Sequence, residues 1–192
     1  TIGQNGIGIL SSYAKLIGVT YLSLIIFVAT ILTIVCKIIK VPFFALLRAI
    51  KEPSLLAFST ASSEAALPKA MEAMEKFGVP KNIVSFVMPT GYTFNLDGTT
   101  LYLTLTTLFC AQVVGIELSF EQQILIMLTL MLTSKGVAGV PRVSLVVLTG
   151  TLHSFGLPVV GVAILLGIDQ LLDMGRTTVN LVGNCIATTV VA

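Results

Sequence analysis

Charged residues are scarce in this sequence: Asp, Glu, Lys and Arg make up only 10% of its 192 residues. A soluble domain typically has about 25% charged residues. Hydrophobic residues account for 55% of the chain, and its mean hydropathy is +1.00. These values exclude an ordinary soluble domain and indicate an integral membrane protein. The net charge is only +2 and no basic patch with interleaved aromatic residues occurs, so we expect no nucleic-acid partner.

Residues that could form disulfides or bind transition metals are also few. The three cysteines, Cys36, Cys110 and Cys185, are far apart and each lies in an apolar run. We therefore interpret them as small core side chains. The single histidine, His153, lies in an apolar segment and is more typical of a packed or interfacial residue than of a proton relay.

The first apolar segment is an uncharged run of 21 residues from Leu16 to Cys36. As a helix it is long enough to span about 30 Å of hydrocarbon, and we place this transmembrane helix at residues 16–40. Seven of the eleven basic residues follow between Lys37 and Lys81. The positive-inside rule puts that region in the cytoplasm, so the first helix runs from outside to inside. The chain starts at Thr1 with no signal-peptide pattern and stops after an apolar run, so we expect it to be part of a longer membrane protein.

Two segments contain apolar arms that are too short to cross a bilayer. Residues 43–77 contain a short apolar arm, a serine-rich tip at 60–63 and a second arm, and residues 120–156 repeat this pattern around a tip broken by Gly and Pro at 134–141. Each pattern predicts a re-entrant hairpin. Such non-helical backbone at membrane depth is tolerated only where protein or a wet cavity covers it.

Between the hairpins, residues 82–116 form a span that the sequence Asn95 to Thr99 interrupts. This stretch places an amide, a carboxylate and a hydroxyl in mid-span, and Gly98 loosens the helix so that carbonyls can turn toward a ligand. Oxygen atoms of these kinds suit a cation such as Na⁺. The alternative is a helix kink whose polar groups are satisfied locally.

The last predicted transmembrane helix, at residues 159–192, is apolar except for one polar face. At about 100° per residue, its polar side chains fall within an arc of roughly 100°. Each ionisable group near a bilayer centre costs about 2.5–3.5 kcal/mol, so we predict a ligand and ion site on this face. The residues of the face are Asp169, Asp173, Arg176, Thr177, Asn180 and Asn184.

The charges on this face suggest what the ligand is. Asp173 and Arg176 are three residues apart and could simply neutralise each other, as a structural ion pair. Asp169 would then remain and call for a cation. A zwitterionic ligand also fits, because its ammonium would meet a carboxylate and a further carboxylate would meet the guanidinium.

The order of these segments is typical of an inverted-repeat transporter. A hairpin and a broken span are followed by a hairpin and a polar-faced span, and the two pairs start from opposite sides of the membrane. The predicted fold is therefore an all-α integral membrane protein, with an inverted-repeat transporter core, two re-entrant helical hairpins and broken transmembrane helices. One rival is an intramembrane aspartyl protease using Asp97 with Asp169 or Asp173, but Arg176 would keep Asp173 ionised. Another rival is a passive channel.

Four stretches together resemble the glutamate transporter family of dicarboxylate/amino acid:cation symporters. They are ASSEAALP at 61–68, PTGYTFNLDGT at 89–99, SKGVAGVP at 134–141 and DQLLDMGRTTVNLVGN at 169–184. The resemblance covers nearly the whole chain and implies that it is the carboxy-terminal transport core. It implies cation-coupled uptake of L-glutamate or L-aspartate across the plasma (inner) membrane by an elevator movement, with hairpin 2 as the outer gate. It also implies lipid contacts, no enzymatic activity, no cofactor beyond a coupling cation, and a homotrimer formed through a scaffold domain that is missing from this chain.

The resemblance also implies roles for single residues. Asp173 would bind the substrate amino group and Arg176 its side-chain carboxylate. The rest of the substrate pocket would comprise Ser62, Ser63, Thr99, Val137, Gly139, Thr177 and Asn180. Gly91, Asn95, Asn180 and Asn184 match one sodium site, Thr93 and Ser134 of the hairpin-2 tip a second, and Asn95 with Asp97 a third.

Some residues depart from the family pattern or receive no role from it. Asn184 stands where sodium-coupled members often have Asp, and Leu103 where eukaryotic members carry a proton-accepting Glu, so the coupling ion is either Na⁺ or H⁺. Asp173 with Arg176 favours an acidic amino acid over the alternative, a C4-dicarboxylate, because the C4-dicarboxylate branch lacks that Asp. Asp169 has no assigned contact, and one interpretation is that it balances Arg142 or Lys135. For Lys135, Arg142 and Glu64, the simpler interpretation is that they are solvated loop charges.

Overall fold

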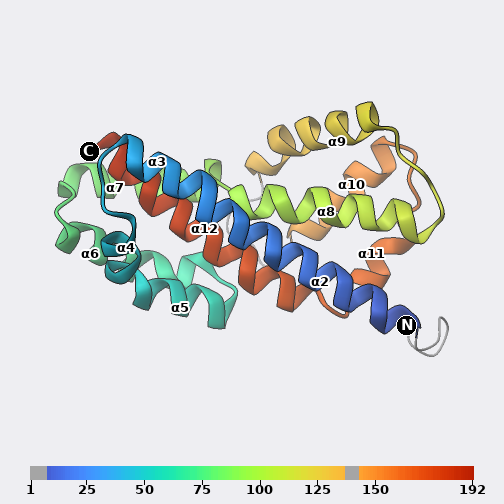
Figure 1. Cartoon of the computed structure of the whole chain (residues 1–192), viewed down its shortest axis with the longest axis horizontal. Coiled ribbons are helices and arrows are strands. Elements are labelled where there is room, and N and C mark those ends of the chain that lie inside the picture. Colours follow the sequence, from blue (N-terminus) through green and yellow to red (C-terminus); the bar gives the residue numbers. More distant parts are fainter. Residues whose placement is uncertain (1–7, 137–142) are drawn as a thin grey trace.

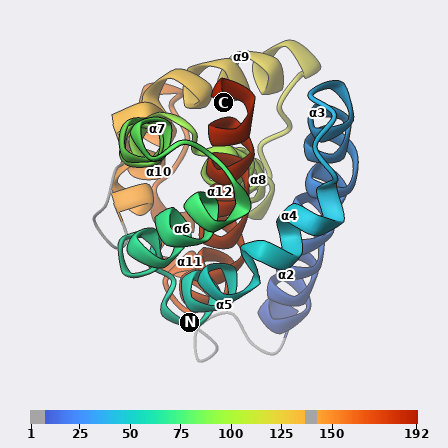
Figure 2. The ribbon, with the colours of Figure 1, turned by 90° about the vertical axis from the view of Figure 1, so that its left-hand side faces the viewer.

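A computed structural model describes residues 8–136 and 143–192, with side chains placed for residues 10–135 and 144–192. Over these ranges the chain contains helices, turns and loops but no strand, which confirms the all-α prediction for this part of the chain. The helices run mostly along one long axis, and the last of them lies among the others (Figures 1 and 2). The last helix is therefore the central one, and helices from both halves of the chain pack against it.

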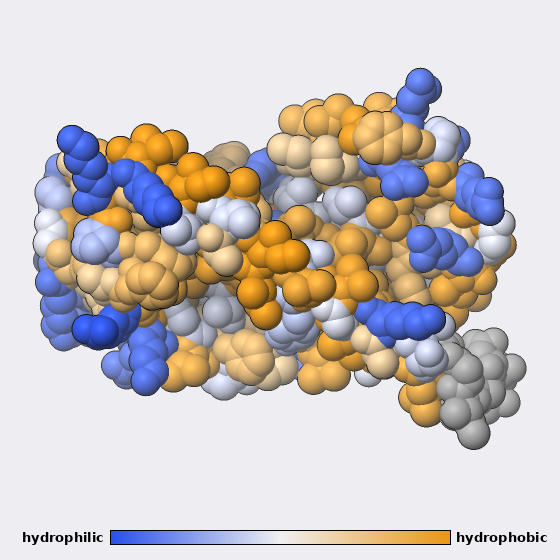
Figure 3. All heavy atoms as spheres, viewed as in Figure 1, coloured by the Kyte–Doolittle hydropathy of each residue, from blue (hydrophilic) through white to orange (hydrophobic). Residues whose placement is uncertain are grey.

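The first rod consists of α2 (Gly8–Phe27), the π-helical segment η1 (Val28–Leu32) and α3 (Thr33–Ile38). Within it, Leu10–Ile38 is the one described helix that is both long enough and apolar enough to cross a membrane. Many of its large side chains, such as Ile25 and Ile34, are more than half exposed. Figure 3 shows the consequence: apolar surface over the middle of the molecule, with charged side chains gathered toward its ends.

The first helical hairpin contains α4 (Phe43–Ala49), α5 (Lys51–Thr60) and α6 (Ser63–Phe77). Its tip is short because Ala61 adopts a left-handed conformation (φ 49°) and Ser62 caps α6 by accepting a hydrogen bond from Ala65 N (3.3 Å). Both arms contact the last helix. Small and flexible buried side chains, including Ala57, Ala66 and Met74, allow this close packing.

A broken helix and a second hairpin follow. The helices α7 (Lys81–Phe94) and α8 (Asp97–Val113) are separated at residues 95–96, within the break expected at Asn95 to Thr99. The hairpin contains α9 (Phe120–Thr133), the 3₁₀ turn η2 (Ser134–Gly136) and α10 (Val143–Ser154). A capping box starts α9, in which the side chains of Ser119 and Gln122 each accept from the other's main-chain amide.

The last span is two helices, so the expectation of one helix over 159–192 was wrong. A turn at residues 166–168 separates α11 (Val160–Leu165) from α12 (Asp169–Val191). At the end of α11, the hydroxyl of Tyr13 donates to the carbonyl of Ile164 (2.6 Å), one of the last carbonyls that lack a helical partner. Ile168 leaves the helical region (φ −124°), and Asp169 then starts α12, where a carboxylate interacts favourably with the helix dipole.

Candidate functional site

The six residues of the predicted polar face are all buried in the structure. Their exposed fractions lie between 3% and 7%, which is unusual for a face with three ionisable side chains. This face lies against α7 and α8, and α12 also contacts both arms of the first hairpin and α2. The six residues are Asp169, Asp173, Arg176, Thr177, Asn180 and Asn184.

Three glycines bring the α7–α8 break into close contact with α12. A Cβ at Gly98 would lie 2.3 Å from the main-chain oxygen of Arg176, and a Cβ at Gly91 would lie 1.9 Å from Asn184 Oδ1. On α12 itself, a Cβ at Gly183 would lie 2.6 Å from Asp97 Oδ2. Real Cβ atoms do not approach other atoms this closely. At Gly98 the obstacle is the main chain of Arg176, so only glycine allows this packing, and at Gly91 and Gly183 a Cβ would displace the facing side chain of Asn184 or Asp97.

Asp173 and Arg176 form a buried ion pair one turn apart on α12. Arg176 Nε lies 2.9 Å from Asp173 Oδ1, although its N–H is not directed at that oxygen and makes no hydrogen bond to the described residues. Thr177 donates a 2.7 Å hydrogen bond to the same carboxylate oxygen. The Asp173 carboxylate thus accepts a hydrogen bond from the Thr177 hydroxyl. The guanidinium of Arg176 makes no hydrogen bond to this carboxylate, so its N–H donors stay available.

Asn180 and Thr99 connect α12 to the start of α8. Asn180 Nδ2 donates to Thr99 Oγ1 (2.8 Å), and the main-chain amide of Thr99 donates to Asn180 Oδ1 (3.2 Å). The amide belongs to the first turn of α8, whose N–H groups have no helical partner. The two side chains predicted to share a pocket are therefore in direct contact.

Asn184 has a free buried acceptor beside the end of α7. Its Nδ2 donates to the carbonyl of Met88 (2.8 Å), while its buried Oδ1 has no hydrogen-bond partner among the described residues and faces Gly91. Asp97 and Asn95 lie against the same helix at Gly183, one residue earlier. An unsatisfied buried oxygen is costly unless a donor or a cation meets it, so this place fits a cation held by oxygen ligands. The described residues contain no cluster of three or more His, Cys, Asp or Glu side chains.

The beginning of the hairpin-2 tip reaches the same break. Ser134 is fully buried and its hydroxyl lies 3.3 Å from that of Thr100. Lys135 Nζ donates a 2.7 Å hydrogen bond to the carbonyl of Phe94, the last residue of α7 and the neighbour of Thr93. Lys135 is therefore engaged at the carboxyl end of a half-helix, where a cation is favourable, and is not simply a solvated loop charge. Three other predicted residues of this tip, Val137, Gly139 and Arg142, lie outside the described residues.

The tip of hairpin 1 contributes less than expected. The side chain of Ser62 serves as the cap of α6, and Ser63 is the first residue of that helix. No hydrogen bond joins either serine to the polar face of α12 in the part of the chain that the structure describes. Their predicted place in the substrate pocket stays a prediction.

Sequence reasoning missed Tyr102. Its hydroxyl donates a 2.6 Å hydrogen bond to Asp169 Oδ1, and the Cζ atom of Arg176 lies 5.0 Å from the centre of its ring. Asp169 therefore contacts a tyrosine, and Lys135 is bonded elsewhere, to the carbonyl of Phe94. The available signal was its spacing: Tyr102 follows Gly98 by four residues and Thr99 by three, and so shares their face of α8.

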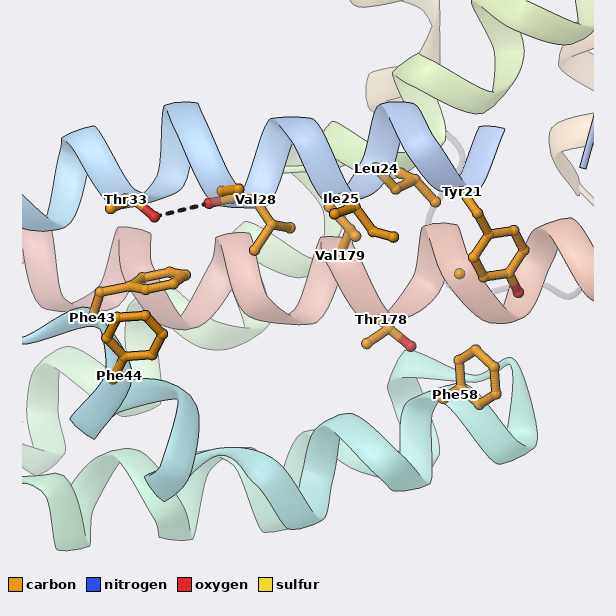
Figure 4. A pocket seen from close by; sticks show the side chains of 12 residues that line it. Tyr21, Leu24, Ile25, Val28, Thr33, Phe43, Phe44, Phe58, Thr178 and Val179 are labelled. Atoms are coloured by element: carbon orange, nitrogen blue, oxygen red, sulfur yellow. Dashed lines mark hydrogen bonds between the residues drawn. The ribbon is translucent and has the colours of Figure 1, made fainter. Parts of the chain in front are cut away.

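An apolar groove lies on the other side of α12. A cavity of about 470 Å³ runs between α2, η1, α12 and the first hairpin, with Leu24, Val28, Phe43 and Phe58 among its walls (Figure 4). The α12 residues that line it include Val179 and lie opposite the polar face of that helix, at about 100° per residue. The groove is therefore separate from the polar site.

Comparison with known proteins agrees with this geometry. The model of the sodium:dicarboxylate symporter family matches residues 1–192. The chain belongs to this family. It is 50% identical over 192 residues to the proton/sodium-glutamate symport protein of Bacillus subtilis (strain 168), and 47% identical over 192 residues to the proton/glutamate-aspartate symporter of Escherichia coli (strain K12). It is also 46% identical over 193 residues to the C4-dicarboxylate transport protein of Bacillus subtilis (strain 168).

These alignments cover all of this chain but only part of each relative. The chain spans 44% to 46% of the length of these three relatives. The family is one of symporters, and the three relatives are named as symport or transport proteins and not as enzymes, which confirms the expected family and argues against the protease alternative. Membership of a symporter family implies an integral membrane protein, in agreement with the exposed apolar surface of α2 and α3.

Proposed function

We propose that this protein is a secondary active transporter that carries L-glutamate or L-aspartate into the cell together with Na⁺ or H⁺, across the plasma (inner) membrane. The observation that carries the proposal is the buried pair of Asp173 and Arg176 on α12. A carboxylate and a guanidinium next to each other complement the ammonium and the side-chain carboxylate of an acidic amino acid. Two of the named relatives are glutamate symporters, which supports the same substrate class.

Arg176 is suited to the side-chain carboxylate of the substrate. It carries five N–H donors and makes no hydrogen bond to the residues that the structure describes, only an ion contact and a ring contact. In the proposed complex its donors bind the carboxylate in bidentate fashion, and Asp173 binds the ammonium. Thr99, Thr177 and Asn180 complete the pocket, with Ser62, Ser63 and the backbone at 137–139 at the α-carboxylate.

The coupling cation is a second substrate, bound near the helix break. The free Oδ1 of Asn184 beside Gly91 and the carboxylate of Asp97 beside Gly183 supply oxygen ligands there. The other proposed ligands are Thr93, Asn95, Ser134 and Asn180. The carbonyl end of α7 and the oxygens of these side chains can replace part of the water shell of a sodium ion.

In the proposed cycle, the two helical hairpins enter the membrane without crossing it, and hairpin 2 acts as the outer gate. The contacts of Ser134 with Thr100 and of Lys135 with Phe94 link the start of its tip to the broken helix. The described helices would then move as a unit, a transport domain, past a scaffold that also forms a homotrimer and contacts lipid. The first hairpin, α2, α7 and α8 pack against α12, and α9, α10 and α11 pack against α8, which supports movement as one body.

C4-dicarboxylate uptake is the second candidate, because a C4-dicarboxylate transport protein is 46% identical to this chain. Such substrates carry two carboxylates and no ammonium. Asp173 would then repel the substrate instead of binding it. We therefore rank acidic amino acids first.

Radiolabelled L-aspartate uptake tests the proposal. The purified protein is reconstituted into proteoliposomes, and inward Na⁺ and H⁺ gradients are imposed separately. Uphill accumulation with one gradient, blocked by unlabelled glutamate but not by succinate, is the expected result. Equilibration without accumulation would indicate a channel, and block by succinate alone would indicate a dicarboxylate carrier.

A further inference from the structure

Asp169 is the charged residue of α12 to which the proposed function gives no ligand, and its partner is a tyrosine of α8. The hydroxyl of Tyr102 donates a 2.6 Å hydrogen bond to Asp169 Oδ1, and the two residues are 0% and 3% exposed. A buried carboxyl group without a partner would be costly, so this hydrogen bond explains how the fold tolerates Asp169. The same contact constrains the ring of Tyr102.

The ring of Tyr102 in turn contacts the guanidinium of Arg176. The Cζ atom of Arg176 lies 5.0 Å from the ring centre, within the distance of about 6 Å at which a cation and an aromatic face attract each other. The Nε atom of the same guanidinium lies 2.9 Å from Asp173 Oδ1. The guanidinium is thus held by a ring of α8 and by a carboxylate of its own helix.

Two acids on α12 share the face of this one guanidinium. Asp173 precedes Arg176 by three residues and Asp169 precedes it by seven, so all three side chains lie on the same face of the helix. Tyr102 binds Asp169 with its hydroxyl and presents its ring to Arg176. Tyr102 therefore occupies Asp169 with a hydrogen bond, and Arg176 stays beside Asp173.

We propose that Tyr102 and Asp169 are positioning residues that hold the guanidinium of Arg176 where the substrate carboxylate binds, and so set the selectivity for acidic amino acids. The inference rests on the proposed function, in which Arg176 binds that carboxylate. Bidentate recognition requires the guanidinium plane to be held within about 0.5 Å and 10–20°. A guanidinium drawn toward Asp169 would no longer meet this condition.

The test uses Tyr102→Phe, Asp169→Asn and the double variant in the proteoliposome assay, with KM and maximal rate measured separately. Tyr102→Phe keeps the ring but frees Asp169, so KM for L-aspartate should rise about tenfold, the effect of losing one hydrogen bond to a charged group. The ratio of aspartate to L-serine uptake should fall by a similar factor. Asp169→Asn keeps an acceptor for the hydroxyl and removes the competing charge, so KM should change less than threefold, roughly 0.6 kcal/mol.

The double variant is the decisive measurement. With the competing acid gone, Tyr102→Phe/Asp169→Asn should have a lower KM than Tyr102→Phe alone, although it lacks the tyrosine hydroxyl. Tyr21→Phe is the matched control, because Tyr21 also donates to α12, at the carbonyl of Leu171 (2.7 Å), but lines the apolar groove. It should leave the selectivity ratio unchanged.

Three results would overturn the inference while aspartate uptake by the wild-type protein is normal. They are an unchanged KM in Tyr102→Phe, a double variant worse than either single variant, and an equal loss of aspartate and serine uptake, which indicates a structural role only. Absence of aspartate uptake by the wild-type protein would instead refute the proposed function, and the inference with it.

Discussion

Replacement of Arg176 by alanine tests the substrate assignment most directly. The guanidinium is buried, with its side chain 8% exposed, and its Nε lies 2.9 Å from Asp173 Oδ1. If it binds the substrate carboxylate through two hydrogen bonds, each to a charged group and worth about 1.5–3 kcal/mol, the variant loses at least about 3 kcal/mol of substrate affinity. This corresponds to a loss of more than 100-fold in affinity for L-glutamate or L-aspartate.

The same substitution changes the folded protein, and the assay has to separate the two effects. Asp173 keeps the hydrogen bond from Thr177 but loses its opposite charge, and an unpaired buried charge costs about 3–5 kcal/mol. Thermal unfolding in detergent should therefore be measured beside uptake in proteoliposomes. Arg176→Lys is the matched variant: it keeps the positive charge but has no planar fork, so it should fold normally and still lose much of its acidic selectivity.

Selectivity gives the clearest outcome. A neutral amino acid such as L-serine has no second carboxylate, so its uptake by Arg176→Ala should be retained relative to that of aspartate, and the aspartate-to-serine ratio should fall by at least about 100-fold. Unchanged glutamate uptake in a folded Arg176→Ala variant would refute the role of Arg176. An equal loss of both uptakes would show that the residue is only structural.

Three further predictions follow from the same contacts. Asp173→Asn should reduce uptake of acidic amino acids about 100-fold while keeping the Thr177 hydrogen bond, and undiminished amino acid uptake would point to a dicarboxylate carrier. Asn184→Asp adds a carboxylate beside Gly91 and should lower the Na⁺ concentration for half-maximal uptake about tenfold, whereas an unaltered Na⁺ titration would exclude Asn184 as a ligand. Gly98→Ala should destabilise the fold by about 1–3 kcal/mol, because its Cβ would lie 2.3 Å from the main chain of Arg176. The control is Gly18→Ala, whose Cβ would lie in open space, with no neighbouring group within 4 Å. Equal unfolding temperatures of the two variants would refute the close approach at Gly98.

The architecture could be predicted from sequence wherever it depends on local signals. The apolar run after Leu16, the break at residues 95–96 and the serine-rich tip are each determined by composition, turn chemistry or helix period. The turn at residues 166–168 was missed because the run from Val143 to Ile168 is uncharged and has no proline after Pro158. That turn depends on contacts between distant residues, such as the hydrogen bond from Tyr13 to the carbonyl of Ile164.

The polar face of α12 was predictable because a helix converts sequence spacing directly into direction. The residues of α8 that contact this face could not be predicted, because α8 and α12 are separated in the sequence by more than fifty residues of hairpin and loop. Thr99 and Asp97 entered the site only because they belong to a recognisable polar interruption. Tyr102 lies in a largely apolar helix, where an aromatic side chain is ordinarily a core residue, and only its spacing from Gly98 and Thr99 distinguishes it.

The placement of the glycines explains why this polar face can exist within an apolar protein. Each buried charge or amide needs a partner at hydrogen-bonding distance, and partners on another helix are reachable only if the backbones approach closely. Gly91 and Gly98 allow this approach from the broken helix, and Gly183 allows it from α12. A Cβ at Gly98 would separate the helices, because it would meet the main chain of Arg176, whereas a Cβ at Gly91 or Gly183 would displace the side chain of Asn184 or Asp97 from its present contacts. The glycines are therefore as necessary to the proposed site as the charged residues, although none of them has a side chain that could bind a ligand.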